Sequence, residues 1–285
     1  MSNSVIEIEN GVNGYVNLVR HVLAHGEEVS PRGMRTREIE DAVIHIDDVY
    51  NTLPLKVDRG PVPGIGAVEA CQILAGESYN DLIVAVGPQF RNYAESDGIF
   101  HGAYGPRTRD QYPLALDKLR NDSDTRQAVV TLWNPNLDNQ PDKRDYPCTI
   151  LHQFRIRNNK LNMSVYMRSN DVWLGAAYDF FQFTRVQIAM ASVLGIEPGK
   201  YAHHVGSLHI YEQHYDAAEH LKMTDQIVPI PTITGSTWED VRSSAKAALD
   251  AASGTISIFN TSADARWYAD AMITAIEKNK AKDSQ

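Results

Sequence analysis

Cys148 is the residue in this sequence that is best placed to act as a nucleophile. It follows Pro147 at the expected start of a strand, and Arg168 lies twenty residues further along the chain. A cysteine attacks as its thiolate, which a neighbouring guanidinium stabilises. A hairpin between the two residues would bring them to one edge of a sheet. A lone cysteine is more often a small buried hydrophobic residue, which is what we expect of Cys71.

Three arginines and a serine have the chemistry of a phosphate site. Arg32, Arg126 and Arg168 are far apart in the chain, and Ser169 directly follows Arg168. Each arginine taken singly is most simply a surface or salt-bridge residue. Guanidinium groups bind phosphate oxygens in bidentate fashion, so convergence of these side chains would create an anion site.

His209 and Tyr211 alternate along a predicted strand and therefore share one face of it. They are either satisfied polar residues of that face or hydrogen-bonding partners of a sugar hydroxyl. Zinc is a third interpretation, because four histidines are clustered in the sequence, but their spacing lacks the HExxH and CxxC patterns, so no metal is expected. The four histidines are His203, His204, His209 and His214.

The composition narrows the possible partners and locations. The 285 residues carry a formal net charge of −9, which argues against a nucleic-acid polymer as partner. Two cysteines do not make a disulfide framework, which favours a cytoplasmic setting. The N-terminus lacks the pattern of a signal peptide, and no apolar stretch reaches 18 residues, so no membrane partner is expected.

Strands and helices follow one another without strict βαβ alternation, which predicts an α+β fold and a single domain spanning residues 1–285. A hairpin is expected around the Asn158-Asn159 turn. The other expected elements are helices over 12–25, 66–75, 178–194, 237–252 and 262–279, strands over 128–133 and 201–211, and a helix that follows the strand 201–211 and ends at about Met223.

Five sequence blocks follow one another between residues 124 and 214: DTRQAVVTLWNP, YPCTILHQF, YMRSNDVWLG, YDFFQF and HVGSLHIYEQH. Together they resemble the thymidylate synthases and the related phage-type dCMP hydroxymethylases. The resemblance is strongest from Arg126 to His214, weaker in the N-terminal half, and nearly absent over the last 60 or so residues, which are predicted to be helical. The resemblance implies a mixed β-sheet packed against helices and a homodimer that associates sheet to sheet.

The resemblance also implies roles for the residues that do chemistry. Cys148 matches the nucleophile that adds to C6 of a pyrimidine. Glu69 matches a glutamate that organises water and protons, and Tyr104 matches an active-site tyrosine. Arg168 and Ser169 match phosphate ligands, with Arg168 also near the thiol.

Other matched positions concern the phosphate and the sugar. Arg32 is the best match for an N-terminal phosphate arginine, with Arg35 as a rival. Arg126 matches an arginine that reaches the partner subunit's phosphate, and its neighbour, usually a second arginine, is Gln127 here. Residues 209 and 211, a histidine and a tyrosine, match the binders of the ribose 3′-hydroxyl.

The implied co-substrate is 5,10-methylenetetrahydrofolate. Phe90 and Tyr93 fall where synthases usually have tryptophans beside the folate, and Asp171 matches an aspartate near the folate ring. No metal is implied.

Asp179 is the most informative departure from the synthases, which have asparagine at this position. A carboxyl group accepts from N4 of cytosine and, when protonated, donates to N3, whereas an asparagine amide suits uracil. Ser207 agrees, since GSLH resembles the hydroxymethylase form. Without the resemblance, Asp179 could simply be the N-cap of the predicted helix 178–194.

The sequence therefore predicts a cytidylate 5-hydroxymethylase that adds water, where a synthase would add hydride to give a methyl group. CMP and dCMP stay open, although small residues at Ala176 and Ala177 could admit a 2′-hydroxyl. Two alternatives remain. One is a thymidylate synthase acting on dUMP, and the other is a catalytically silent relative that binds a nucleotide or RNA.

Overall fold

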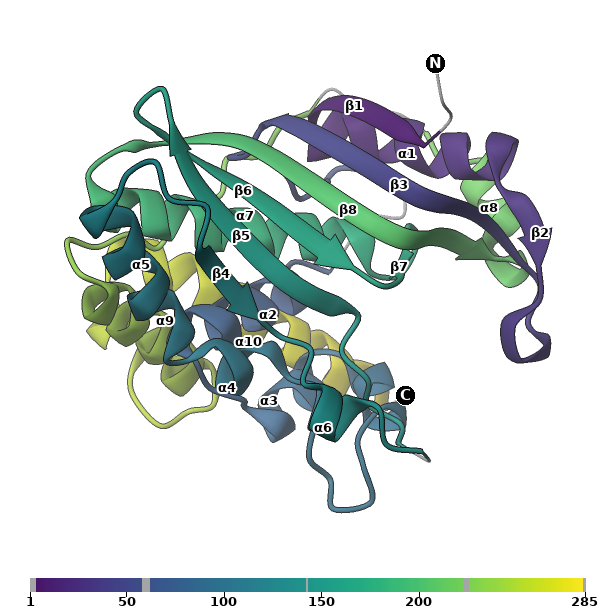
Figure 1. Ribbon diagram of the computed structural model, residues 1–285. Helices are drawn as coiled ribbons and strands as arrows, with labels where there is room; N and C mark the ends of the chain where they lie inside the picture. The colour runs from purple at the N-terminus through teal and green to yellow at the C-terminus, as the bar shows by residue number, and fades with distance from the viewer. Residues whose placement is uncertain (1–3, 58–61, 142, 223–225, 284–285) are drawn as a thin grey trace.

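A twisted mixed β-sheet, with its helices gathered behind it, forms the core of the computed structural model (Figure 1). The structure describes residues 4–57, 62–141, 143–222 and 226–283. The fold is α+β, as the sequence predicted. The strands are β1 Val5–Asn10, β2 Glu27–Val29, β3 Thr36–Asp48, β4 Ala128–Thr131, β5 Thr149–Arg157, β6 Lys160–Met167, β7 Asn170–Asp171 and β8 Glu197–Tyr211.

The main path of the sheet runs in the order β1-β3-β8-β6-β5-β4. Strand β6 pairs in parallel with β8 and antiparallel with β5. The short strand β2 pairs with the start of β3, and the short strand β7 pairs with β8 near its end. Strands that are adjacent in the sheet thus bring distant parts of the chain to one edge.

Among the described residues, the sequence predicted the five longest helices, whereas the four helices between residues 80 and 138 were missed. The helix expected after Tyr211 is short, Tyr215–Glu219, and its expected end near Met223 lies outside the described residues. The helices are α1 Gly11–His25, α2 Pro63–Ala75, α3 Asn80–Val86, α4 Tyr104–Thr108, α5 Gln111–Asn121, α6 Pro135–Asp138, α7 Ala176–Leu194, α8 Tyr215–Glu219, α9 Trp238–Ala252 and α10 Ala263–Asp283, with 3₁₀ turns η1 Pro31–Gly33, η2 Pro88–Asn92, η3 Glu212–His214 and η4 Ile258–Asn260. Helices α2 and α7 end at Gly76 and Gly195, whose φ angles of 70° and 69° form left-handed caps.

The predicted hairpin is present and joins β5 to β6. Asn158 and Asn159 form its turn with φ angles of 55° and 57°. Asparagine tolerates this left-handed region better than most residues, and two such residues in succession give the turn type whose twist matches paired strands.

Among the described residues, the sequence analysis missed the strands β1, β2, β3 and β7, although alternation marks β1 and β3. In β3 the buried Ile44 and Ile46 alternate with the less buried His45 and the exposed Asp47. In β1, Ile6 and Ile8 alternate with exposed residues in the same way. These strands extend the sheet past β8 and complete one side of the fold.

The C-terminal helices α9 and α10 pack against α2, and the buried hydrophobic residues form one continuous cluster. Within the described residues, no helix is long and apolar enough to cross a membrane.

Candidate active site

One cavity of about 880 Å³ gathers nearly all of the predicted site residues. It lies between the ends of β5, β6 and β8 and a wall formed by α2, η2 and the start of α4. The predicted residues that line it are Arg32, Glu69, Phe90, Tyr93, Tyr104, Cys148, Arg168, Ser169, Asp171, Asp179, His209 and Tyr211. Arg126 is not among them.

Cys148 and Arg168 are adjacent, as the hairpin argument predicted. Arg168 Nη2 lies 3.7 Å from Cys148 Sγ, while its Nε donates to the Pro147 carbonyl at 3.0 Å. The Cys148 carbonyl accepts a backbone hydrogen bond from Arg168 at 2.9 Å, which holds the two residues together. Burial raises the pKa of the Cys148 thiol, and the Arg168 guanidinium opposes that rise. Cys71, in contrast, is fully buried on α2.

Asp179 is buried in the first turn of α7, with both carboxyl oxygens hydrogen-bonded. Its Oδ2 accepts from Asn170 Nδ2 at 2.6 Å, and its Oδ1 accepts from Gln182 Nε2 at 3.0 Å. Burial raises the pKa of Asp179 to about 7, although these two hydrogen bonds act in the opposite direction. The group can therefore gain or lose a proton near neutral pH.

Asp179 is not the N-cap of its helix. The N-cap position is Gly175, and the backbone N–H of Asp179 donates to the Gly175 carbonyl at 3.0 Å. The interpretation of Asp179 as a simple capping residue is therefore wrong, because its side chain turns toward Asn170 and Gln182 in the cavity.

Glu69 and Tyr104 lie on the same cavity wall and are partly buried. Glu69 Oε2 is buried and makes no hydrogen bond to the described residues. Burial, together with the neighbouring Asp179 charge, holds the pKa of Glu69 well above its usual range. Tyr104 OH accepts hydrogen bonds from the backbone and side chain of Thr149, at 3.3 and 3.0 Å. Glu69 thus has an oxygen free to accept from a substrate or a water molecule.

The other end of the cavity carries the residues predicted for phosphate and sugar. Arg32 is exposed and lines the cavity, whereas its rival Arg35 makes ion pairs with Glu28 and Glu212 outside it. Strand pairing sets Glu38 opposite His209, and Ser207 Oγ donates to Glu38. Arg32 is thus the better placed of the two arginines for a ligand in this cavity.

The wall predicted for folate has an aromatic side and one acceptor without a partner. Phe90 is half-buried and Tyr93 is 51% exposed. Asp171 Oδ1 accepts from the backbone N–H groups of Trp173 and Leu174, but its Oδ2 is buried without a hydrogen bond to the described residues. An aromatic surface with a buried acceptor fits a flat heterocycle that carries N–H donors.

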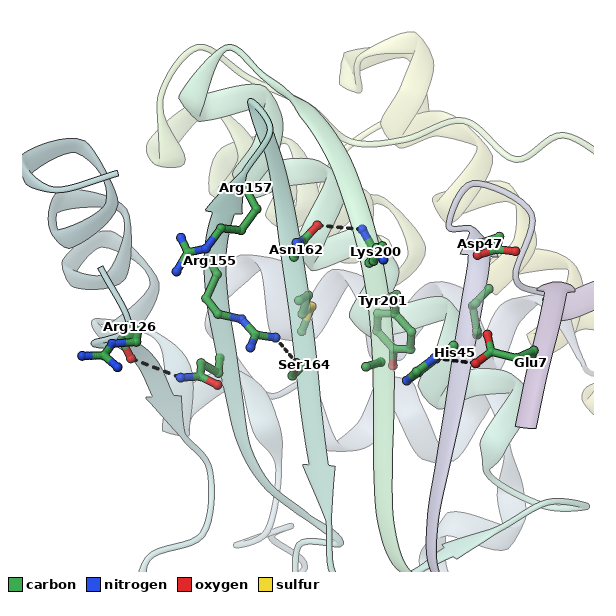
Figure 2. A pocket seen from close by; sticks show the side chains of 14 residues that line it. Glu7, His45, Asp47, Arg126, Arg155, Arg157, Asn162, Ser164, Lys200 and Tyr201 are labelled. Atoms are coloured by element: carbon green, nitrogen blue, oxygen red, sulfur yellow. Dashed lines mark hydrogen bonds and ion pairs between the residues drawn. The ribbon is translucent and has the colours of Figure 1, made fainter. Parts of the chain in front are cut away.

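Arg126 lies on the open face of the sheet, in a separate polar depression (Figure 2). Gln153 Nε2 donates to its backbone carbonyl at 3.1 Å, and Arg155, Arg157 and Lys200 line the same depression. The Arg126 guanidinium is not a neighbour of Cys148 within one chain. Its role in binding the phosphate in the partner subunit's site therefore stays a prediction.

The four clustered histidines do not converge. His203 Nδ1 bonds to Tyr201 OH at 2.8 Å in the core, and His204 stacks on Tyr166 across the open face. His209 Nδ1 lies 3.2 Å from the Ser207 carbonyl, and His214 stacks on Trp173. The zinc interpretation therefore has no geometric support from these residues.

Sequence reasoning missed Asn170, Gln182 and Glu38 as cavity residues. Gln182 could have been found, because it lies three residues after Asp179 on one helix face. Asn170 follows Arg168-Ser169 directly, but its contact with Asp179 depends on how β7 meets α7. Glu38 could not be found while β3 itself was unrecognised.

Comparison with known proteins agrees with this fold and identifies the family. A family model described as thymidylate synthase matches residues 13–251. A curated relative, a deoxyuridylate hydroxymethyltransferase of Bacillus phage SP01, is 32% identical over 230 residues, covering 75% of this chain. The chain spans 59% of that relative's length. The chain belongs to the thymidylate synthase family.

Proposed function

We propose that this protein is a cytidylate 5-hydroxymethylase, which converts CMP or dCMP into its 5-hydroxymethyl derivative. The observation that carries the proposal is the buried Asp179 carboxyl in the same cavity as Cys148. Its pKa of about 7 lets it act as an acceptor or as a donor near neutral pH.

Asp179 suits the hydrogen-bonding edge of cytosine. The N4 amine of cytosine donates to a carboxyl oxygen, and its N3 accepts from the protonated acid. With uracil, the O4 atom would face the ionised carboxylate, and both groups are hydrogen-bond acceptors. A mispaired buried polar edge costs about 1–3 kcal/mol, roughly tenfold or more in selectivity.

The chain's own residues then activate the base. Cys148 thiolate adds to C6, which makes C5 enamine-like, while Arg168 stabilises the thiolate before attack. Asp179 exchanges a proton with the cytosine edge as charge develops on N3 and N4. Phe90 and Asp171 would hold 5,10-methylenetetrahydrofolate, whose one-carbon unit would join C5. The C5 proton and tetrahydrofolate then leave, water adds to the exocyclic methylene, and elimination of Cys148 from C6 restores the pyrimidine ring. Glu69 Oε2 is available to orient the water that completes the hydroxymethyl group.

The similarity to the phage relative favours a hydroxymethyl product, but that relative acts on a different base. The name of that relative gives deoxyuridylate as its substrate, which makes deoxyuridylate 5-hydroxymethylation the second candidate function. Asp179 is the residue that separates the two candidates, because an amide at this position would suit uracil and a carboxyl group suits cytosine.

The proposal includes a homodimer with shared sites. The open sheet face carries Arg126 in a polar depression, and stacking of two such faces would let it reach a partner's phosphate (Figure 2). The phosphate of each nucleotide would then bind Arg32, Arg168 and Ser169 of one chain and Arg126 of the other.

A nucleotide panel tests the proposal. CMP, dCMP, UMP and dUMP are each incubated with 5,10-methylenetetrahydrofolate, and products are identified by mass spectrometry. The expected result is 5-hydroxymethylcytidylate, with no dihydrofolate seen by absorbance. Methylated uridylate with dihydrofolate would identify a synthase, 5-hydroxymethyluridylate would support the second candidate, and no product from any nucleotide would support a silent relative.

A further inference from the structure

Helix α10 lies outside the residues matched by the family model, yet it packs against two elements of the cavity wall. One is α2, which carries Glu69. The other is α3, which leads through Gly87 into the 3₁₀ turn η2 that carries Phe90.

Asn279 of α10 binds the end of α3 directly. Its Nδ2 donates to the carbonyls of Ala85 and Val86, at 2.9 Å each. The last carbonyls of a helix have no partner within the helix, so this amide supplies the bonds that the end of α3 would otherwise lack. The contact fixes the backbone immediately before Gly87.

Gly87 in turn sets the position of Phe90. The Phe90 N–H donates to the Gly87 carbonyl at 3.0 Å. The Phe90 ring lies so close to Gly87 that a Cβ there would be 2.9 Å from its Cδ2. A shift at the end of α3 would therefore be passed on to the aromatic wall of the cavity.

Helices α10 and α2 are closely packed around Gly64. A Cβ on Gly64 would lie 2.7 Å from the Ala275 Cβ and 2.8 Å from the Ala271 carbonyl oxygen. It would also lie 3.1 Å from Val86 Cγ1 of α3. The three helices thus meet at one point, and α10 fixes α2 and α3 relative to each other.

We propose that Asn279 is a positioning residue that holds the Phe90 wall against the Glu69 wall and thereby sets the affinity for the folate co-substrate. The inference rests on the proposed function, because it assumes that folate binds along Phe90. It assigns a role in that site to a helix beyond the matched residues.

Kinetic constants of Asn279→Ala test the proposal. The KM for 5,10-methylenetetrahydrofolate should rise roughly three- to tenfold, as expected for loss of a helix-capping interaction, while the nucleotide KM and saturated kcat stay within about twofold. Lys278→Ala, an exposed neighbour on the same helix, is the matched control and should change neither constant. An unchanged folate KM, or equal changes in all constants, would overturn the proposal.

Two further measurements keep the test independent of folding and of the reaction. Asn279→Asp preserves size but removes the N–H donors, and it should weaken folate binding at least as much as Asn279→Ala. Calorimetric titration of tetrahydrofolate with dCMP present should show the same weakening, whichever product the wild type makes. If the wild type makes no 5-hydroxymethylcytidylate but the titration shows the loss, only the proposed function fails. If tetrahydrofolate binds both variants as tightly as the wild type, the role of Asn279 fails.

Discussion

At the scale of single residues, the two cysteines have opposite environments. Cys148 lies beside the Arg168 guanidinium in the cavity, whereas Cys71 is buried in the apolar packing of α2. We predict that Cys148→Ser lowers turnover by roughly three orders of magnitude or more while nucleotide binding persists, because a serine hydroxyl ionises far less readily than a thiol. Cys71→Ala should retain turnover. Steady-state kinetics and nucleotide titration check both variants, and substantial turnover by Cys148→Ser would exclude it as the nucleophile.

Asp179 should make the folded protein less stable as pH rises. Its folded pKa of about 7 exceeds its ordinary value of 3.8, so the folded state holds the proton more tightly. The stabilisation is complete below the ordinary value and is lost as pH rises through 7. Asp179→Asn removes this dependence, so its stability relative to wild type should increase by roughly 2–3 kcal/mol between pH 5 and pH 8. Denaturant unfolding at the two pH values measures it, and a constant difference would contradict the raised pKa.

At the scale of elements, β7 and α7 together control the Asp179 carboxyl. Asn170 on β7 donates to one oxygen, and Gln182, one helical turn along α7, donates to the other. Because the Asn170 bond lowers the pKa of Asp179, Asn170→Leu should raise it further. The limb of the pH–rate profile that reports Asp179 should then move to higher pH, measured as kcat/KM for dCMP. Asn121→Ala, at the exposed end of α5, should leave the profile unchanged. A profile of Asn170→Leu that matches the wild type would show that the bond does not tune Asp179.

Elements with strong local signals were predictable from the sequence. The Asn158-Asn159 turn, the glycine caps at Gly76 and Gly195, and the long apolar α7 all follow from local chemistry. Contacts between distant segments were not predictable. The pairing of Glu38 with His209 needs β3 and β8 side by side, and the bond from Asn170 to Asp179 needs the start of α7 to turn back toward β7.

The resemblance assigned roles to residues by their positions in the sequence. The structure shows which of these residues lie close together. The resemblance favoured Arg32 over Arg35 but left Arg35 as a rival, since both are arginines in one loop. Their neighbours separate them, because Glu28 and Glu212 bind Arg35 and leave Arg32 at the cavity.

At the scale of the whole molecule, the separation of Arg126 from Cys148 predicts sites shared between subunits. Arg126→Ala and Cys148→Ala should each be weakly active or inactive alone. Mixing them in equal amounts should restore about a quarter of wild-type activity, because half of the dimers would be mixed and each would hold one intact site. Activity after subunit exchange measures this. A fully active monomer, or no recovery in dimers shown to exchange, would contradict shared sites.

The central claim, that one carboxyl group selects cytosine, is tested most directly by kcat/KM for dCMP and dUMP in the wild type and in Asp179→Asn. The change is nearly isosteric, so the fold should persist, and it restores the amide that suits O4 and N3–H of uracil. We predict that the wild type prefers dCMP and that the variant loses cytosine activity, gains uracil activity by roughly tenfold or more, and still gives mainly the hydroxymethyl product. A wild type that already prefers dUMP, or a variant that keeps its preference for dCMP, would contradict the claim.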